Sequence, residues 1–188
     1  MNKQTIRDVN LIGKTVLVRV DYNVPFKPNT TQISNDSRIT ASLPTIKYLI
    51  EKGCKILLCS HLGRPKGNIV SQLRMAPVSI RLSELLDTPV VQASECVGQT
   101  VTDLVAQLPK NGILMLENIR FYPGEENNEP EFSKALASLA NLYVNDAFGA
   151  AHRAHASTHG VTKFLPAVAG LLMNRELNIL ADIVDSPK

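Results

Sequence analysis

Residues 15–20 read TVLVRV, a mostly apolar, β-branched run of strand length. A run of this kind, without a regular polar face, is typical of a strand that is covered on both faces of a sheet. Residues 55–60 (KILLCS) and 112–116 (GILML) have the same character. Such strands occur in parallel sheets covered by helices, so these segments decide the fold class.

Segments with helical spacing lie between the predicted strands. Residues 37–52 carry apolar side chains three and four residues apart, and Gly53 follows where a helix would end. Further helices are predicted for 77–86, 97–108, 131–139 and 171–184, and further short strands for 89–91, 142–144 and 167–169. This alternation predicts an α/β fold: a doubly wound, Rossmann-like three-layer sandwich with a mainly parallel sheet of about six strands.

Composition narrows the functional classes. The 188 residues are 44% hydrophobic and 20% charged, and the net charge of +3 is too small to indicate a nucleic-acid or membrane-surface partner. Residues 1–10 lack a secretory signal pattern, and the apolar stretch 164–173 is too short to span a membrane. We therefore expect a cytoplasmic protein, in which Cys54, Cys59 and Cys96 are core thiols and form neither a disulfide nor a metal site.

Polar and charged side chains follow the predicted strands, where open parallel sheets bind their ligands. They are Asp21 and Asn23; His61 and Arg64; Glu117, Asn118 and Arg120; and Asn145 and Asp146, with His152, Arg153 and His155 downstream. Arginines offer bidentate hydrogen bonds to phosphate or carboxylate, so the set predicts a site for a small phosphorylated acid. The Asp21 and Asn23 side chains could hold a hydroxyl of that ligand. Taken singly, each arginine is better explained as a solvated surface residue, and only the shared position favours a site.

Three local motifs leave alternatives open. Gly63, in residues 61–65 (HLGRP), permits close backbone approach to an anion, although a plain strand-to-helix loop would also use it. Residues 152–155 (HRAH) lack a third metal ligand, so we expect anion binding or local hydrogen bonding and no metal. Residues 123–126 (PGEE) predict a turn with a solvated acidic edge. Neither a Walker phosphate loop nor a dinucleotide fingerprint is present in the sequence.

Four segments resemble those of the phosphoglycerate kinase family in order and spacing. They are VLVRVDYNVP (16–25), SHLGRP (60–65), LENIRFYPGEE (116–126) and VNDAFGAAHRAHAS (144–157). Tyr22 and Phe26 are conservative departures, and residues 27–35 are somewhat unusual for the family. The resemblance implies a monomeric glycolytic enzyme that uses Mg-ATP/ADP. Its reaction transfers a phosphoryl group between 1,3-bisphosphoglycerate and ADP, giving 3-phosphoglycerate and ATP.

The resemblance also implies site roles. Asp21 and Asn23 would contact the hydroxyl and carboxyl end of 3-phosphoglycerate, and Gly63 would line the substrate. The phosphate end would be bound by His61, Arg64, Arg120 and Arg153. Arg38, which spacing alone leaves inside the helix 37–52, would bind substrate and stabilise the transferring phosphoryl group.

The family has two domains, and the resemblance assigns residues 1–170 to the amino-terminal, 3-phosphoglycerate-binding one. Residues 171–188 would begin the interdomain helix, with the nucleotide-binding domain missing. We therefore expect a chain that is inactive alone, binds no cofactor, and exposes apolar surface that could promote self-association. The alternative is a stand-alone, non-catalytic anion-binding or interaction module.

Overall fold

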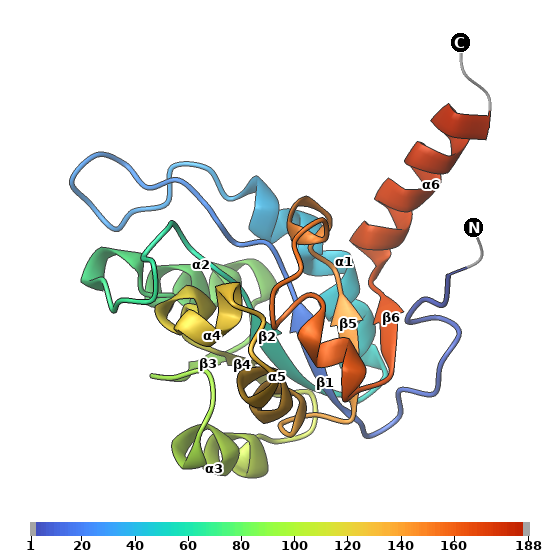
Figure 1. The fold of residues 1–188 in the computed structure, drawn as a ribbon, viewed down its shortest axis with the longest axis horizontal. Coiled ribbons are helices and arrows are strands. Elements are labelled where there is room, and N and C mark those ends of the chain that lie inside the picture. The colour runs from blue at the N-terminus through green and yellow to red at the C-terminus, as the bar shows by residue number, and fades with distance from the viewer. Residues whose placement is uncertain (1–2, 186–188) are drawn as a thin grey trace.

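The computed structural model describes residues 3–185, and its core is a parallel sheet with the strand order β3-β4-β2-β1-β5-β6 (Figure 1). The strands are β1 (Thr15–Arg19), β2 (Lys55–Cys59), β3 (Val90–Gln92), β4 (Ile113–Met115), β5 (Leu142–Asn145) and β6 (Ala167–Ala169). β1 lies at the centre, with β2 on one side and β5 on the other. The described residues thus confirm the predicted α/β sandwich with six strands, all of them parallel.

The two faces of the sheet bury two separate apolar clusters, because side chains along a strand alternate between its faces. In β1, Val16 and Val18 point into one cluster and Leu17 into the other. In β5, Leu142 and Val144 likewise oppose Tyr143. Apolar burial on both faces explains why these strands lack polar alternation in sequence.

Helices cover both faces. The cluster that contains Val16 is closed by α1 (Ser37–Glu51), α2 (Ala76–Leu86) and the start of α6 (Leu171–Asp185). The cluster that contains Leu17 is closed by α3 (Gln99–Gln107) and α5 (Pro130–Ala137). In Figure 1, α6 projects from the body of the fold, and Ile179 and Leu180 on it are about half-exposed. The predicted helices and strands are all present, with ends shifted by at most two residues.

The prediction that residues 123–126 form a turn with a solvated acidic edge is wrong. These residues form a short helix, α4 (Pro123–Glu126), and Glu125 is 0% exposed, although Glu126 does reach solvent. The carboxylate of Glu125 accepts hydrogen bonds from the N–H and hydroxyl of Ser157, a residue far along the chain. A local sequence pattern cannot show a partner at that separation.

The three cysteines are buried free thiols, as predicted. Between residues 3 and 185, no helix is long and apolar enough to cross a membrane.

Candidate functional site

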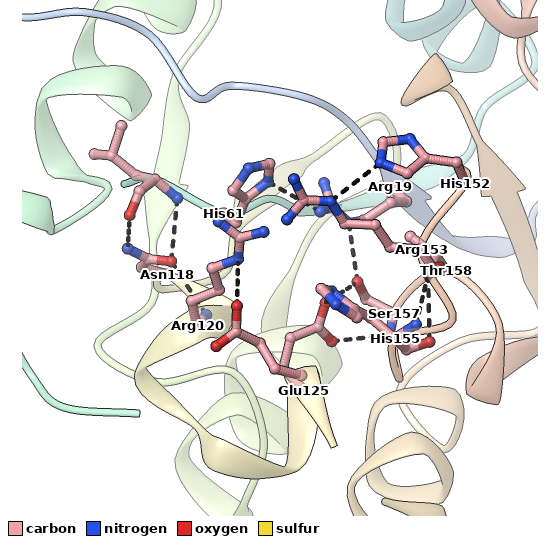
Figure 2. Close-up of polar contacts among 12 residues, drawn as sticks. Arg19, His61, Asn118, Arg120, Glu125, His152, Arg153, His155, Ser157 and Thr158 are labelled. Carbon is pink, nitrogen blue, oxygen red and sulfur yellow. Dashed lines mark hydrogen bonds and ion pairs between the residues drawn. The ribbon is translucent and has the colours of Figure 1, made fainter. Parts of the chain in front are cut away.

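The candidate site lies at the carboxyl ends of β1, β2, β4 and β5, whose following segments meet at one edge of the sheet (Figure 2). The chain order reverses at β1, because β2 lies on one side of it and β5 on the other. Ligands of open parallel sheets bind where the strand order reverses. The loops after these four strands therefore place their side chains where the fold favours a ligand.

Arg19, the last residue of β1, is a fully buried arginine beneath this edge. Its Nε donates to Ser157 Oγ at 2.9 Å, one terminal nitrogen lies 3.1 Å from His61 Nδ1, and the other donates to the carbonyl of Val20. All three guanidinium nitrogens are thus held by protein groups. Arg19 supplies positive charge to the edge and positions its neighbours.

His61, directly after β2 and Ser60, is buried and surrounded by positive charge. Burial, and then the charges of Arg19, Arg120, Arg153 and Arg38, lower the pKa of His61 to about 2. The ring is therefore neutral at physiological pH. Figure 2 shows Arg19, Arg120 and Arg153, which come from three different segments, on the same edge as His61.

Arg120, in the 3-10 turn after β4 (η2, Ile119–Phe121), is fixed by its surroundings. Its side chain is 4% exposed, donates to the carbonyl of Gly63 at 2.8 Å and lies 3.3 Å from a carboxylate oxygen of Glu126. Burial, the largest cause, lowers the pKa of Arg120 from its usual value. The guanidinium is pre-oriented by these contacts, which reduces the entropy lost when a ligand binds.

Asn118 joins the loop after β4 to the loop after β2. Its amide Nδ2 donates to the carbonyls of Leu62 and Leu73 at 2.7 and 2.9 Å, and its Oδ1 accepts from the N–H of Leu62 and of Arg120. Asn23 Oδ1 accepts from Gly63 N–H at 2.8 Å. The backbone of residues 61–63 is therefore held from both neighbouring strands, as a preformed binding loop requires.

Gly63 has φ of 64°, and a Cβ at this position would lie 2.7 Å from Leu73 Cδ2. Glycine adopts this conformation without strain, and any larger residue here would also require the Leu73 side chain to shift. The Gly63 N–H donates to Asn23 and the Gly63 carbonyl accepts from Arg120, so this backbone is bound by protein side chains, and close approach of an anion stays a prediction.

Asp21 and Arg38 form an ion pair at the rim of the site. Arg38 lies in the first turn of α1, its side chain is 50% exposed, and its guanidinium donates to Asp21 Oδ2 at 2.6 Å. A small cavity of about 170 Å³ lies beside this pair and reaches Asp146 and Leu172 at the start of α6. Both partners are accessible enough to exchange this contact for a ligand.

The remaining predicted residues are less constrained. Arg64 is exposed and makes neither a hydrogen bond nor an ion pair with residues 3–185. Arg153 is half-buried, and its Nε lies 3.4 Å from His152 Nε2. No group of three His, Cys, Asp or Glu side chains that could hold a metal ion occurs within the described residues, including residues 152–155.

The sequence prediction missed Arg19, Ser157 and Glu125. Arg19 lies within an apolar strand, so the rule of inspecting residues after a strand did not select it, although an arginine in a buried run was itself a signal. Ser157 and Glu125 lack such a signal, because their role depends on contacts between distant segments.

The chain is similar to known proteins along nearly its whole length. Residues 6–188 match the family model for phosphoglycerate kinase. A solved phosphoglycerate kinase from Coxiella burnetii is similar, with a TM-score of 0.86 and 35% identity over 100% of this chain and 46% of that one. The enzyme from Pyrococcus horikoshii OT3 gives a TM-score of 0.88 and 33% identity over 98% of this chain and 46% of that one. The chain therefore spans less than half the length of either protein.

Proposed function

This chain belongs to the phosphoglycerate kinase family, and from that premise we propose that it is the substrate-binding half of such an enzyme. The reaction would transfer a phosphoryl group between 1,3-bisphosphoglycerate and ADP, with 3-phosphoglycerate bound here. The observation that carries the proposal is the placement of Arg19, Arg120 and Arg153 on the same sheet edge as His61 (Figure 2), with Arg38 paired to Asp21 at the rim. Concentrated positive charge on rigid strand ends suits phosphoryl transfer, which depends on positioning and electrostatic stabilisation.

Different residues would bind the two ends of the ligand. Arg64, Arg120, Arg153 and His61 would bind the phosphate end, with Gly63 lining the ligand. Asp21 and Asn23 would bind the hydroxyl and carboxyl end, where carboxylate and amide provide the acceptor and donor that a hydroxyl needs. Arg38 would leave Asp21 and stabilise the transferring group.

The nucleotide and its magnesium ion would be held by the part of longer family members that this chain does not span. No group of three His, Cys, Asp or Glu side chains that could hold a metal ion occurs among the described residues, and we derive no step through the ion. Residues 1–170 would form the substrate domain and 171–188 the start of the helix toward the second one. We expect no turnover of ATP by this chain alone, because closure of two domains would complete the site and exclude water.

The proposal is tested by calorimetric titration of the chain with 3-phosphoglycerate at low and raised salt. We expect binding that weakens with salt, as for ionic contacts at an accessible site. Replacing exposed Arg64 by Ala removes one charge-assisted contact without disturbing the fold. Such a contact contributes about 1.5–3 kcal/mol, so affinity should fall by about tenfold or more. Arg38→Ala should keep most of the affinity, because Arg38 serves transfer more than binding.

Arg7→Ala is the matched control. Arg7 stacks on Tyr48, ten residues beyond Arg38 along α1 and so toward the opposite end of that helix. Its variant should bind as the unmodified chain does. Absence of binding at millimolar 3-phosphoglycerate, or equal affinity of the Arg64→Ala and Arg7→Ala variants, would contradict the proposal and favour an interaction module.

A further inference from the structure

A chain of buried hydrogen bonds runs from Glu125 to His61 beneath the candidate site (Figure 2). It begins at α4 and ends directly after β2, and it passes through Ser157 and Arg19. All four side chains are buried. Such a chain restricts where each proton lies, because its members have few alternative partners.

Glu125 is the acceptor at one end. Its two carboxylate oxygens accept from Ser157, one from the N–H at 2.9 Å and the other from the hydroxyl at 2.7 Å. Burial alone raises the pKa of Glu125, but His155, Arg19 and the Ser157 hydrogen bonds outweigh it and place the pKa below its usual value. The group is therefore a carboxylate, which cannot donate.

Ser157 has a single hydroxyl proton, and that proton is committed to Glu125. Its oxygen is thus left to accept, and Arg19 Nε donates to it at 2.9 Å. With another nitrogen bound to the Val20 carbonyl, the Arg19 guanidinium is held at two points, and its third nitrogen faces His61 Nδ1 at 3.1 Å.

The last contact determines the state of the imidazole. A guanidinium has donors only, so His61 Nδ1 must accept and cannot carry a proton. A neutral ring then has its proton on Nε2, and Nε2 forms no hydrogen bond with residues 3–185. It is therefore free to donate to a ligand.

We propose that Glu125, Ser157 and Arg19 are positioning residues that fix His61 as the neutral Nε2–H tautomer, so that the site offers an anion one uncharged donor among its arginines. The tautomer follows from contacts within the chain. Its use by a ligand rests on the proposed function.

Nitrogen-15 NMR of the histidine-labelled chain tests the tautomer directly, because long-range ring correlations distinguish protonated from unprotonated nitrogens. The four histidines are assigned with a His61→Asn variant. Between pH 6 and 8 we expect an unprotonated Nδ1 and a protonated Nε2 on His61. A proton on Nδ1 in the unmodified chain would overturn the proposal.

The positioning role of the hydrogen-bonded chain from Glu125 through Ser157 and Arg19 is tested by Ser157→Ala. Ser157→Thr is the rescue, because threonine restores the hydroxyl. Ser157→Ala should release Arg19 and give His61 a mixture of tautomers, whereas Ser157→Thr should restore the single one. Glu125→Gln should act as Ser157→Ala does, and Glu131→Gln, the same change at an exposed acid of α5, should have no effect. An unchanged His61 spectrum in a folded Ser157→Ala chain would refute the positioning role of Ser157 and Arg19.

Titration with 3-phosphoglycerate tests whether a ligand uses the Nε2–H donor of His61. We expect Ser157→Ala to weaken binding about tenfold through loss of an ordered donor, with Ser157→Thr recovering most of it. If the unmodified chain binds no 3-phosphoglycerate, the proposed function fails while the NMR result still decides the tautomer. If the tautomer changes and the affinity does not, the use of Nε2–H by the ligand is refuted.

Discussion

His61 is the side chain in which burial and neighbouring charge act most strongly on a proton near neutral pH. Its pKa of about 2 in the fold lies far below the ordinary 6.5. Below pH 6.5 His61 binds a proton in the unfolded chain but not in the folded chain. The free energy of unfolding therefore falls as the pH falls toward 2. The contribution is about 1.4 kcal/mol for each pH unit.

We expect His61→Asn to flatten this dependence while Asn Oδ1 still accepts from Arg19. Urea unfolding at pH 7, 6 and 5 should show the unmodified chain losing stability more steeply than His61→Asn, and the offset between the two chains should change only below pH 6.5. His159→Asn, at an exposed histidine, should keep the original slope. Parallel curves for His61→Asn and the unmodified chain would show that His61 titrates normally.

Single residues also show how far sequence reasoning reaches. The position of His61 and Arg120 at one edge of the sheet was predictable, because both follow strands and the carboxyl ends of parallel strands meet there. Arg19 carried a signal, since it lies within an apolar strand, but its partner Ser157 could not be predicted. Glu125 carried no signal, because its burial depends on Ser157, which only the folded chain brings near. Strands such as residues 15–20 were predicted correctly, since their apolar pattern directly reflects burial on both faces.

At the scale of elements, the first turn of α6 is joined to the site by a buried acid. Asp146 follows β5, and its Oδ1 accepts from the N–H of Leu172 and of Met173 at 3.0 and 3.2 Å. Its own N–H donates to the carbonyl of Arg19, and Thr45 Oγ1 on α1 accepts from Leu171 N–H. The helix thus starts on Asp146, directly after β5, and on Thr45 of α1.

We expect Asp146→Ala to fray this turn, because two helix N–H groups lose their acceptor. Loss of such a cap costs about 1–2 kcal/mol. Amide hydrogen exchange at Leu172 and Met173 should accelerate, while Asp146→Asn, which retains Oδ1, should protect both amides. Asp182→Ala, at an exposed acid of α6, is the control. Unchanged exchange in Asp146→Ala would show that the turn is held by packing alone.

At the scale of the whole molecule, charge is distributed unevenly. The net charge is only +3, yet four arginines lie around His61. Their mutual repulsion destabilises the fold, and a bound anion relieves that repulsion, so anions other than the substrate should also stabilise the fold.

Self-association through Ile179 and Leu180 stays a separate prediction, checked by sedimentation at increasing concentration.

We expect sulfate to raise the melting temperature with a saturating concentration dependence. At ten times its dissociation constant, a ligand of the folded state adds about 1.4 kcal/mol, which corresponds to about 3–5 °C for a chain of this size. Arg153→Ala should lose most of the saturating part. General exclusion of sulfate from protein surface raises stability in both chains alike, so the difference between them isolates binding at the site. A rise that is linear in sulfate and equal in both chains would mean that the arginines are already neutralised by their own surroundings, Glu125 and Glu126 above all, and that no anion is needed to complete the edge.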